Sequence, residues 1–582
     1  MPRETLDLTG PWQFQPDPFR QGQSAGYSKA ALDARRWRGV RVPCAFDDCM
    51  PGLRSYEGCG WFTRRIDVPD SWRGRHVDLR FEGVNTKAEA WVNGQLVGSH
   101  DDGYLRFDLP ATGTLRYGQP NTITVKVDST RVDGEVPGLK RGWRPFGGIL
   151  REVSLIATDP LRIAHVSTRA EADGEFEQVI EVTNGRGESV EMCAAVSIRN
   201  KRGIEMARFN TDSINLAAGE AAQFRAAGAV ADIEPWSPES PTLYHTDVRV
   251  LAGGKEADRR TLRIGFRTVH TKGTKLLLNA RPLFLTGFNR HEDSPRTGMC
   301  PDIEIVRKDL ETMKRIGCNF VRLCHYPHHP STLDLCDELG LLAMCEIPLY
   351  WWSQSRQKDG QTFDRTLAAA KRQLESLIRR DINHPSVIFW SVSNENDESI
   401  PDVVEGNREL LDLARKLDRS RPAVHVSNHW HDHPHFDADD VICINDYPTW
   451  WQMYSVSEKP VNFAESTRIW RKELAGLHKR FGGKPILVTE FGGLSFEGVF
   501  GLAGGEDYHA KAIEAEFAGM QAAHVCGATI WCWADHPWPE GGWIGNVTTS
   551  PFGVVTRDRK PLAPFYAAEK FFTAKRKEHM KQ

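Results

Sequence analysis

Two glutamates stand at the ends of apolar, β-rich runs in the second half of the chain. "SVIFWSVSNENDES" (386–399) passes without a turn signal into Asn394 and Glu395, and "PILVTEFGG" (485–493) carries Glu490. Burying a carboxylate costs free energy unless the group is paired or used. A lone strand-end glutamate is as readily a structural ion pair as a catalytic group. Two such carboxylates facing each other, however, are the machinery of glycosidic bond cleavage, one as general acid then base and the other as nucleophile.

The elements that must position these glutamates form an alternating series. After about residue 275, apolar runs alternate with helix-like stretches, which is typical of a parallel sheet covered by helices. Eight such runs predict a (β/α)₈ TIM barrel across 273–582, with its chemistry at the carboxyl ends of the strands. Both glutamates then point into one mouth, whereas Asp397 and Glu398 are expected in a solvated loop. The predicted strands are 283–289, 319–327, 340–348, 386–395, 423–428, 441–448, 485–493 and 527–535.

Before the barrel, short alternating apolar and polar runs are joined by Gly, Asn and Asp turns. Runs such as "HVDLRFEGV" and "AEAWVNGQLVGS" predict a jelly-roll-like, sugar-binding-like β-sandwich over 1–160. A second series over 161–272, including "FEQVIEVTN", has the length of one immunoglobulin-like β-sandwich. The fold class is therefore multidomain, β plus α/β, with two sandwiches followed by the barrel that carries the active site.

The composition excludes several classes of function. Of 582 residues, 40% are hydrophobic and 26% charged, with a formal net charge of −3, so no nucleic-acid partner is predicted. No apolar run approaches the length of a membrane span, and "MPRETLDLTGPWQF" lacks the regions of a signal peptide. Twelve cysteines without a CxxC pair indicate a reducing compartment. We expect a cytoplasmic protein with no membrane partner, or a periplasmic or secreted one if a signal peptide has been removed.

Tryptophans crowd into the C-terminal half of the chain. Flat apolar rings with one polar atom suit the faces of sugars, although about half of these side chains are expected to be ordinary core residues. The clustered ones are Trp450, Trp451, Trp531, Trp533, Trp538 and Trp543.

Several of these motifs resemble glycoside hydrolase family two, the β-galactosidases and β-glucuronidases. The resemblance rests on "WSVSNENDES", "PILVTEFGG", "LTGFNRHED", "VRLCHYPHHP", "IWCWAD" and "PFGVVTRDRKPLAPFY", and it extends back to "LTGPWQF" near the start. It implies a retaining exo-β-glycosidase that needs no cofactor, with Glu395 as acid/base and Glu490 as nucleophile. It also implies an oligosaccharide or glycoside as substrate and a possible homodimer or homotetramer.

The resemblance assigns further residues to the sugar pocket. Asn394 would hydrogen-bond the sugar 2-OH, and Tyr447 would hydrogen-bond the nucleophile and favour its ionised form. His325 and Trp531 match family positions that line the pocket. The charge on Glu490 is expected to raise the pKa of Glu395, which must keep its proton.

The sequence departs from the family at the places that choose the sugar. Ser550 and Phe552 stand where family β-glucuronidases have an Asn-x-Lys pair for the substrate carboxylate, and no clear metal-binding set occurs near "EIPLYWW", so no metal is predicted. Where the family has an Asp before "FGGI", this chain has Arg141 and Arg144. These differences favour a neutral β-hexoside such as a galactoside. The alternative is a uronidase that uses Arg141 or Arg144 for the carboxylate, rather than pairing them with an acid at a domain interface.

Two readings from other classes stay open. "NHWHDHPHF" places His429, His431, His433 and His435 at the end of the fifth strand, and His-x-His pairs ligate metals in some barrel hydrolases. Such a site would also have to recruit side chains such as His291, His325 or Asp535, whose spacing matches no metal motif. A non-catalytic carbohydrate-binding protein is the other alternative, although a binder has no need of two buried strand-end carboxylates.

Overall fold

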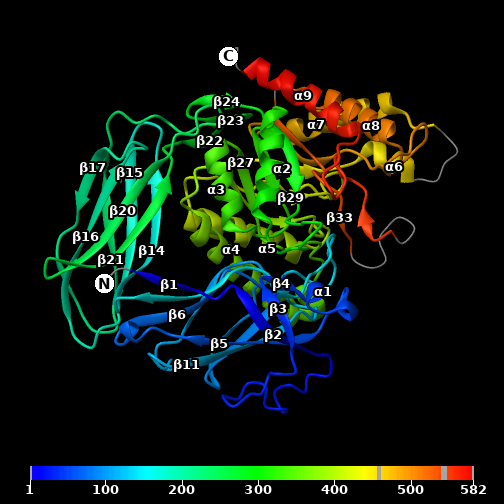
Figure 1. Cartoon of the computed structure of the whole chain (residues 1–582). Coiled ribbons are helices and arrows are strands. Elements are labelled where there is room, and N and C mark those ends of the chain that lie inside the picture. The colour runs from blue at the N-terminus through cyan, green and yellow to red at the C-terminus, as the bar shows by residue number, and fades with distance from the viewer. Residues whose placement is uncertain (1–2, 455–459, 523, 539–546, 580–582) are drawn as a thin grey trace.

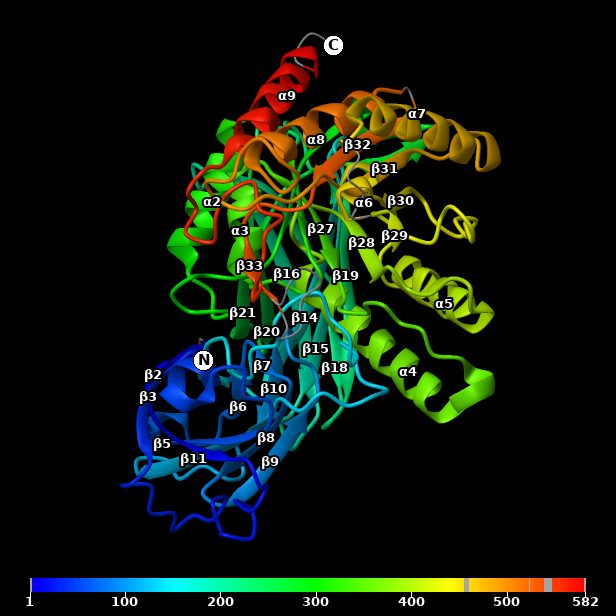
Figure 2. The ribbon, with the colours of Figure 1, turned by 90° about the vertical axis from the view of Figure 1, so that its right-hand side faces the viewer.

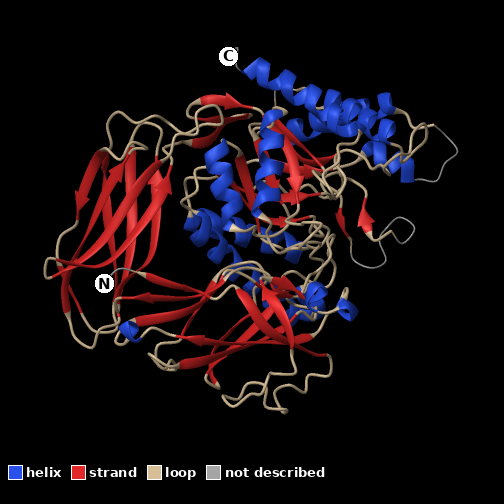
Figure 3. Ribbon diagram, viewed as in Figure 1, coloured by secondary structure: helices blue, strands red, loops and turns tan. Residues whose placement is uncertain are grey.

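The computed structural model describes residues 3–454, 460–522, 524–538 and 547–579, and it consists of two β-sandwiches and a barrel. In Figure 1 the first sandwich lies below the barrel and the second lies to its left. The helices gather in the barrel part, while the regular secondary structure of the sandwiches is mostly strand, joined by loops (Figure 3). None of the described helices is long and apolar enough to cross a membrane. The predicted fold class is therefore confirmed.

The first sandwich consists of antiparallel sheets around one apolar core. Alternation of buried and part-exposed positions along β6 (His76–Phe81) turns one face of the sheet to this core. A four-stranded sheet pairs β1 (Glu4–Asp7), β13 (Val153–Thr158), β6 and β10 (Phe107–Pro110). A six-stranded sheet pairs β3 (Arg38–Val42), β2 (Gly10–Asp17), β5 (Cys59–Asp67), β11 (Pro120–Asp128), β8 (Lys87–Val92) and β9 (Gln95–His100). Short pieces complete it: β4 (Cys44–Ala45), β12 (Gly148–Ile149), β7 (Val84–Asn85), α1 (Phe46–Cys49), η1 (Pro51–Leu53) and η2 (Asp70–Trp72).

The second sandwich packs two antiparallel sheets face to face. Strict alternation of buried positions along β15 (Glu175–Asn184) gives this strand one core face, as in sandwich folds generally. One sheet pairs β14 (Leu161–Ala170), β15 and β19 (Ala221–Ala229). The other pairs β17 (Glu205–Asn210), β16 (Val190–Arg199), β20 (Tyr244–Ala252) and β21 (Lys255–Ile264), with β18 (Ile214–Leu216) also on β16.

Eight parallel strands close into the barrel, β25 pairing with β32. Every residue of these strands is buried, as expected for parallel strands covered on both faces. The strands are β25 (Leu285–Arg290), β26 (Phe320–Leu323), β27 (Leu342–Glu346), β28 (Val387–Asn394), β29 (Ala423–Ser427), β30 (Ile442–Asn445), β31 (Ile486–Phe491) and β32 (Val525–Ile530). A small antiparallel sheet of β22 (Val269–Lys272), β23 (Lys275–Leu278) and β24 (Arg281–Leu283) precedes them, and β33 (His536–Pro537) pairs with β34 (Thr549–Ser550) near the end.

The helices that cover the barrel begin at recognisable signals. The Asp302 side chain caps α2 by accepting from the Ile305 amide, Pro330 is the first residue of α3, and Gly340 ends α3 in the left-handed conformation. These helices turn their apolar faces to the strands in the largest core of the molecule. They are α2 (Ile303–Arg315), α3 (Pro330–Leu339), α4 (Arg356–Asp381), α5 (Pro401–Leu417), α6 (Pro448–Tyr454), α7 (Phe463–Arg480), α8 (Glu506–Gly519) and α9 (Ala563–His579).

The first sandwich is tied to the barrel by residues 129–147, which connect β11 to β12 and are called the sandwich segment below. Gln373 of α4 donates a hydrogen bond to the Val136 carbonyl at 2.7 Å, and Gln354 donates to Asp133 at 2.6 Å. Figure 2 shows the first sandwich directly beneath the barrel from a second direction. The sandwich segment therefore reaches the barrel domain in the folded chain.

Candidate active site

A cavity of about 450 Å³ lies at the carboxyl ends of the barrel strands. The sandwich segment forms one of its walls, and the approach is so close that a Cβ on Gly142 would lie 2.6 Å from the hydroxyl of Tyr350. The barrel forms the rest, with aromatic rings prominent among the lining groups. The lining residues are Arg131, Leu139, Lys140, Arg141, Gly142, His325, Tyr350, Trp351, Glu395, Asn428, His431, Asn445, Asp446, Tyr447, Trp450, Trp451, Glu490, Trp531, Trp538 and Phe552.

Glu490, on β31, is buried at the floor of this cavity with only 4% of its surface exposed. Its Oε1 accepts a hydrogen bond from Nη1 of Arg322 at 2.5 Å, and its Oε2 accepts one from the hydroxyl of Tyr447 at 2.5 Å. Nε2 of His325 lies 3.8 Å from Oε1. The Glu490 carboxylate is thus hydrogen-bonded by a guanidinium and a phenol and lies close to an imidazole.

Glu395 directly follows β28 and adopts a φ of 52°, in the left-handed region that most residues avoid. Its amide donates to the Val426 carbonyl on β29 at 2.8 Å, which anchors the turn. On the side chain, Oε1 accepts from Nδ2 of Asn445 at 2.7 Å. Oε2 accepts from Nε1 of Trp351 at 2.9 Å and from Nδ2 of Asn428 at 3.1 Å. These three side-chain donors are all uncharged.

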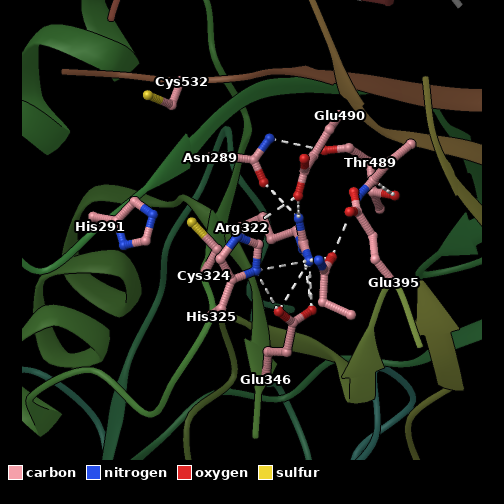
Figure 4. A network of polar contacts seen from close by, with 12 residues as sticks. Asn289, His291, Arg322, Cys324, His325, Glu346, Glu395, Thr489, Glu490 and Cys532 are labelled. Atoms are coloured by element: carbon pink, nitrogen blue, oxygen red, sulfur yellow. Dashed lines mark hydrogen bonds and ion pairs between the residues drawn. The ribbon is translucent and has the colours of Figure 1, made fainter. Parts of the chain in front are cut away.

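Arg322 of β26 connects the groups beneath the cavity (Figure 4). Its guanidinium is fully buried and pairs with Glu346 at 2.7 Å as well as with Glu490. It also donates to Oδ1 of Asn394 at 2.6 Å and to Oδ1 of Asn289 at 2.9 Å. A buried ion pair is retained only where the remaining donors and acceptors are satisfied, and here they are.

The protonation states of the carboxyls follow from these contacts. Burial raises the pKa of Glu490, against the Arg322 guanidinium, which lowers it, and the proximity of Glu395 raises it further. Burial also raises the pKa of Glu395, against the hydrogen bonds from Trp351 and Asn445 and then the charge of Arg322, which lower it. By contrast, the pKa of Glu346 is lowered, since Arg322 and His325 outweigh its burial. Two neighbouring carboxyls resist double ionisation, and of the two it is Glu490 that accepts a hydrogen bond from a guanidinium.

His325 is held as a neutral imidazole. Burial lowers its pKa to about 4, and its Nδ1 lies 2.9 Å from Oε1 of Glu346. Because an ionised carboxylate only accepts, Nδ1 carries the proton and Nε2 is left with a lone pair. The ring stacks on Trp531 with centroids 5.2 Å apart.

The comparison with known proteins identifies the family. Three family models match consecutive parts of the chain: the sugar binding domain of glycosyl hydrolases family 2 over residues 8–159, a central family 2 domain over 161–267, and the family 2 TIM barrel domain over 269–572. The chain belongs to glycosyl hydrolases family 2. It is therefore a glycoside hydrolase, of the exo-β-glycosidase kind found in this family.

Family 2 relatives include both named activities of the family. A β-glucuronidase from Paenibacillus borealis is 29% identical over 605 aligned residues, which cover 96% of this chain and 95% of the relative. A β-galactosidase from Thermoanaerobacter pseudethanolicus is 31% identical over 72% of this chain and 55% of its own. The crystal structure of Ruminococcus gnavus β-glucuronidase matches with a TM-score of 0.88 at 26% identity over 98% of each chain.

Most of the family 2 site residues predicted from the sequence meet at one place. His325, Tyr447, Trp531 and both glutamates line the cavity. Asn394 lies just behind Glu395 and contacts both Arg322 and Asn445. Its Nδ2 has no hydrogen-bond partner within the described part of the chain.

The two candidate arginines of the sandwich segment have different surroundings. Arg141 is 5% exposed and lines the cavity, and its Nε donates to the Gly138 carbonyl at 3.3 Å. Its Nη1 has no hydrogen-bond partner among the residues that the structure describes. Arg144 instead forms an ion pair with Asp47 of the same sandwich and lies over the ring of Phe146. The sequence could not separate these two residues, because they are three positions apart in an irregular loop.

The family position of the missing Asn-x-Lys pair is occupied by small and apolar groups. Phe552 lines the cavity and Ser550 is buried in β34. Of the clustered tryptophans, Trp450, Trp451, Trp531 and Trp538 line the cavity, whereas Trp533 packs in the barrel core against Phe288. Trp543 lies outside the described residues.

Sequence reasoning missed the residues that connect the two glutamates. Arg322 lies inside the fully buried strand β26, and Glu346 and Asn445 are the last residues of β27 and β30. The signal for the first two was present, since an arginine and a glutamate in apolar strands that face one barrel imply an internal pair. Trp351 gave no such signal, because it lies among other aromatic residues after β27.

The prediction that Glu398 belongs to a solvated loop is wrong. Glu398 is 2% exposed, accepts a hydrogen bond from Ser427 at 2.9 Å and lies 3.3 Å from Nε2 of His425. Asp439 on the other side of His425 raises the pKa of that histidine to about 10 against its burial, so the imidazole is a cation. Glu398 is thus buried because a charged partner from β29 compensates it. Asp397 is half-buried and caps a turn by accepting from Ser399.

The histidine-rich loop does not gather into a metal-binding set. His431 lines the cavity and pairs with Asp446 at 3.0 Å, while His433 is exposed and His435 half-buried. Within the described chain, the groups of three or more side chains that could hold a metal are His291, Cys324 and His325, and Asp334, Asp337 and His384.

Proposed function

We propose that this family 2 hydrolase cleaves β-glycosides by double displacement with retention, with Glu490 as nucleophile and Glu395 as general acid and base. The carrying observation is the difference between their partners. Glu490 accepts from the guanidinium of Arg322, whereas the side-chain donors to Glu395 are uncharged. The nucleophile must be ionised while the acid keeps its proton, and a neighbouring cation favours the ionised form.

The chemistry proceeds in two balanced steps. An oxygen of Glu490 attacks the anomeric carbon, the glycosidic C–O bond breaks, and Glu395 gives its proton to the departing oxygen. The products are a glycosyl ester of Glu490 and the free aglycone. Esterification removes the charge on Glu490, so the pKa of Glu395 falls between the steps. Glu395 then takes a proton from water, whose oxygen attacks the anomeric carbon and restores the Glu490 carboxylate.

The remaining pocket groups suit a single sugar ring. The lone pair on Nε2 of His325 can accept a hydrogen bond from a sugar hydroxyl. Nδ2 of Asn394, which has no hydrogen-bond partner among the described residues, can donate one to the 2-OH. Trp531, which lines the cavity, offers an aromatic platform for the apolar side of the ring. Arg141 and Gly142 of the sandwich segment line the cavity together with these barrel residues.

For the substrate we propose a β-uronide, whose carboxylate Arg141 would bind. A guanidinium that is buried without an acidic partner among the described residues carries an uncompensated cost, and burial lowers its pKa to about 10. A substrate carboxylate would complete the pair through charge-assisted hydrogen bonds. The full-length similarity to β-glucuronidases supports this choice.

The test is the Arg141→Gln variant on p-nitrophenyl β-glucuronide, β-galacturonide and β-galactoside. A hydrogen bond to a charged group contributes about 1.5–3 kcal/mol, so we expect kcat/KM on the preferred uronide to fall about 10- to 150-fold. Activity on the galactoside is expected to change by less than about threefold, since that sugar offers no carboxylate. Arg144→Gln is the matched control, because its guanidinium already pairs with Asp47. Equal losses on charged and neutral sugars would contradict the role of Arg141.

A neutral β-hexoside, the substrate that the sequence favours, is the second candidate. The observation for it is Phe552, an apolar ring that lines the cavity where the resemblance places a lysine in β-glucuronidases. If the unmodified enzyme hydrolyses the galactoside with a higher kcat/KM than either uronide, this candidate replaces the first.

A further inference from the structure

A cluster of two imidazoles and a thiol lies beside the proposed nucleophile. One ligand atom from each of His291, Cys324 and His325 falls within 4.8 Å of the others, and all three residues are buried. Figure 4 shows the sulfur of Cys324 between the two rings. His291 is 7% exposed and Cys324 is 0% exposed, whereas His325 reaches the cavity.

In both histidines Nδ1 already has a polar partner. Nδ1 of His325 is bound by Glu346 at 2.9 Å, and Nδ1 of His291 lies 3.1 Å from the hydroxyl of Tyr326. That leaves Nε2 of each ring, and Nε2 of His291 has no hydrogen-bond partner in the described chain. Metal-binding histidines in proteins are oriented in this way, with the far nitrogen held by a carboxylate or another polar group.

A further imidazole stands next to the cluster. The ring of His536 lies 4.1 Å from that of His291, and its Nε2 also has no partner among the described residues. Neutral imidazoles and a thiol are ligands for zinc-like cations, whereas magnesium and calcium prefer oxygen ligands.

We propose that His291, Cys324 and His325 form a binding site for a thiophilic cation of the Zn²⁺ class, whose occupancy inhibits the enzyme. Binding breaks the S–H bond of Cys324 and forms a metal–sulfur bond, and the proton leaves to solvent through the cavity. Nε2 of His325 becomes a metal ligand and is lost as an acceptor for sugar. The cation then lies near Oε1 of Glu490, which is 3.8 Å from that nitrogen. Its positive charge attracts the Glu490 carboxylate and so hinders nucleophilic attack. Zinc and glycoside therefore compete.

Binding is measured first, without reference to any substrate. The EDTA-treated full chain is dialysed against Zn²⁺ and its metal content determined, and the Zn K-edge spectrum is recorded for the loaded protein. We expect one zinc per chain with one sulfur ligand at about 2.3 Å and nitrogen ligands at about 2.0–2.1 Å. Affinity is expected to rise about tenfold per pH unit, because one thiol proton is released on binding. A spectrum with nitrogen and oxygen ligands alone, or no stoichiometric zinc at micromolar concentration, would overturn the proposal.

The variant Cys324→Ser then links the site to inhibition. For the unmodified enzyme we expect zinc to inhibit hydrolysis competitively, with Mg²⁺ as an inert comparison. Cys324→Ser is expected to keep the activity measured without zinc within about threefold of the unmodified enzyme. It is expected to raise the zinc inhibition constant at least about 100-fold. Cys193→Ser, which changes a thiol in the second sandwich, is the matched control and should leave inhibition unchanged. If Cys324→Ser is inhibited like the parent, the site is wrong; if the variant does not fold, the spectrum of the unmodified protein decides alone.

These measurements separate the site from the proposed function. Zinc content and the metal–sulfur distance are independent of which glycoside is hydrolysed, so the site can stand even if the substrate assignment fails. Conversely, a failure to bind zinc leaves the assignments of Glu490 and Glu395 untouched.

Discussion

Glu490 and Glu395 are the same residue type at the ends of two strands of one barrel, yet their surroundings differ in charge. Glu490 receives hydrogen bonds from a buried guanidinium and a phenol, and Glu395 from an indole and two amides. The carboxyl group is the same in both residues, so any difference between their protonation states must come from the neighbouring residues. The difference in charge comes from the neighbouring strands, above all from Arg322 on β26, and the opposite roles that we propose for these two identical side chains rest on it.

The largest effect is expected from Glu490→Ala, which tests whether Glu490 is the nucleophile of the pair. Removing a covalent nucleophile is expected to lower kcat on the order of 10⁵-fold on any aryl β-glycoside, as measured by release of the phenol. The fold should persist, because Arg322 keeps its pair with Glu346. Glu497→Ala, an exposed residue of the following loop paired with Lys560, is the control and should be fully active. Residual activity above about one per cent would remove Glu490 from the nucleophile role.

Glu395→Gln is expected to have the next largest effect, and an effect that depends on the leaving group. Without a proton donor, the first step should slow by about 10²–10⁴-fold for poorly acidic aglycones and far less for strongly acidic phenols. Rates are measured across a series of aryl glycosides with increasing phenol pKa. A uniform loss across the series would place the acid elsewhere.

Tyr447→Phe tests the surroundings of Glu490 without changing those of Glu395. The Tyr447 hydroxyl lowers the pKa of Glu490 by hydrogen-bonding its carboxylate, so its loss should raise that pKa. The nucleophile would then ionise at higher pH, and the acidic limb of the kcat/KM profile is expected to move upward while kcat falls about 10- to 100-fold. An unmoved acidic limb would mean that this hydrogen bond does not govern Glu490.

Trp351→Phe tests the uncharged side and should have the smallest effect. The indole N–H lowers the pKa of Glu395, so its removal raises that pKa and keeps the acid protonated to higher pH. We expect the alkaline limb of kcat/KM to move upward and the maximum rate to fall only a few-fold, as for one neutral hydrogen bond. Movement of the acidic limb instead would assign the indole to the other carboxyl.

The barrel and its two glutamates were accessible from the sequence because their signals are local. An apolar run that ends abruptly in Asn394 and Glu395 needs no knowledge of distant residues. The signal of Arg322 was weaker, a single charged residue in an apolar strand, since parallel strands are buried on both faces and show no polar alternation that marks an inward position. The prediction for Glu398 was wrong for a related reason. The burial of Glu398 depends on His425, which follows 27 positions later, and the charge of His425 depends in turn on Asp439.

The sandwich segment carries a consequence for how such enzymes diversify. Arg141 reaches the cavity from a different domain than the one that holds Glu395 and Glu490, and it does so on an irregular connection between β11 and β12 rather than on a strand. Connections of this kind tolerate substitution far better than the strands they join. Selectivity for the sugar can therefore change by replacement of one loop while the reaction itself is inherited intact, and chimeras that exchange residues 129–147 between relatives are a direct route to new glycosidases.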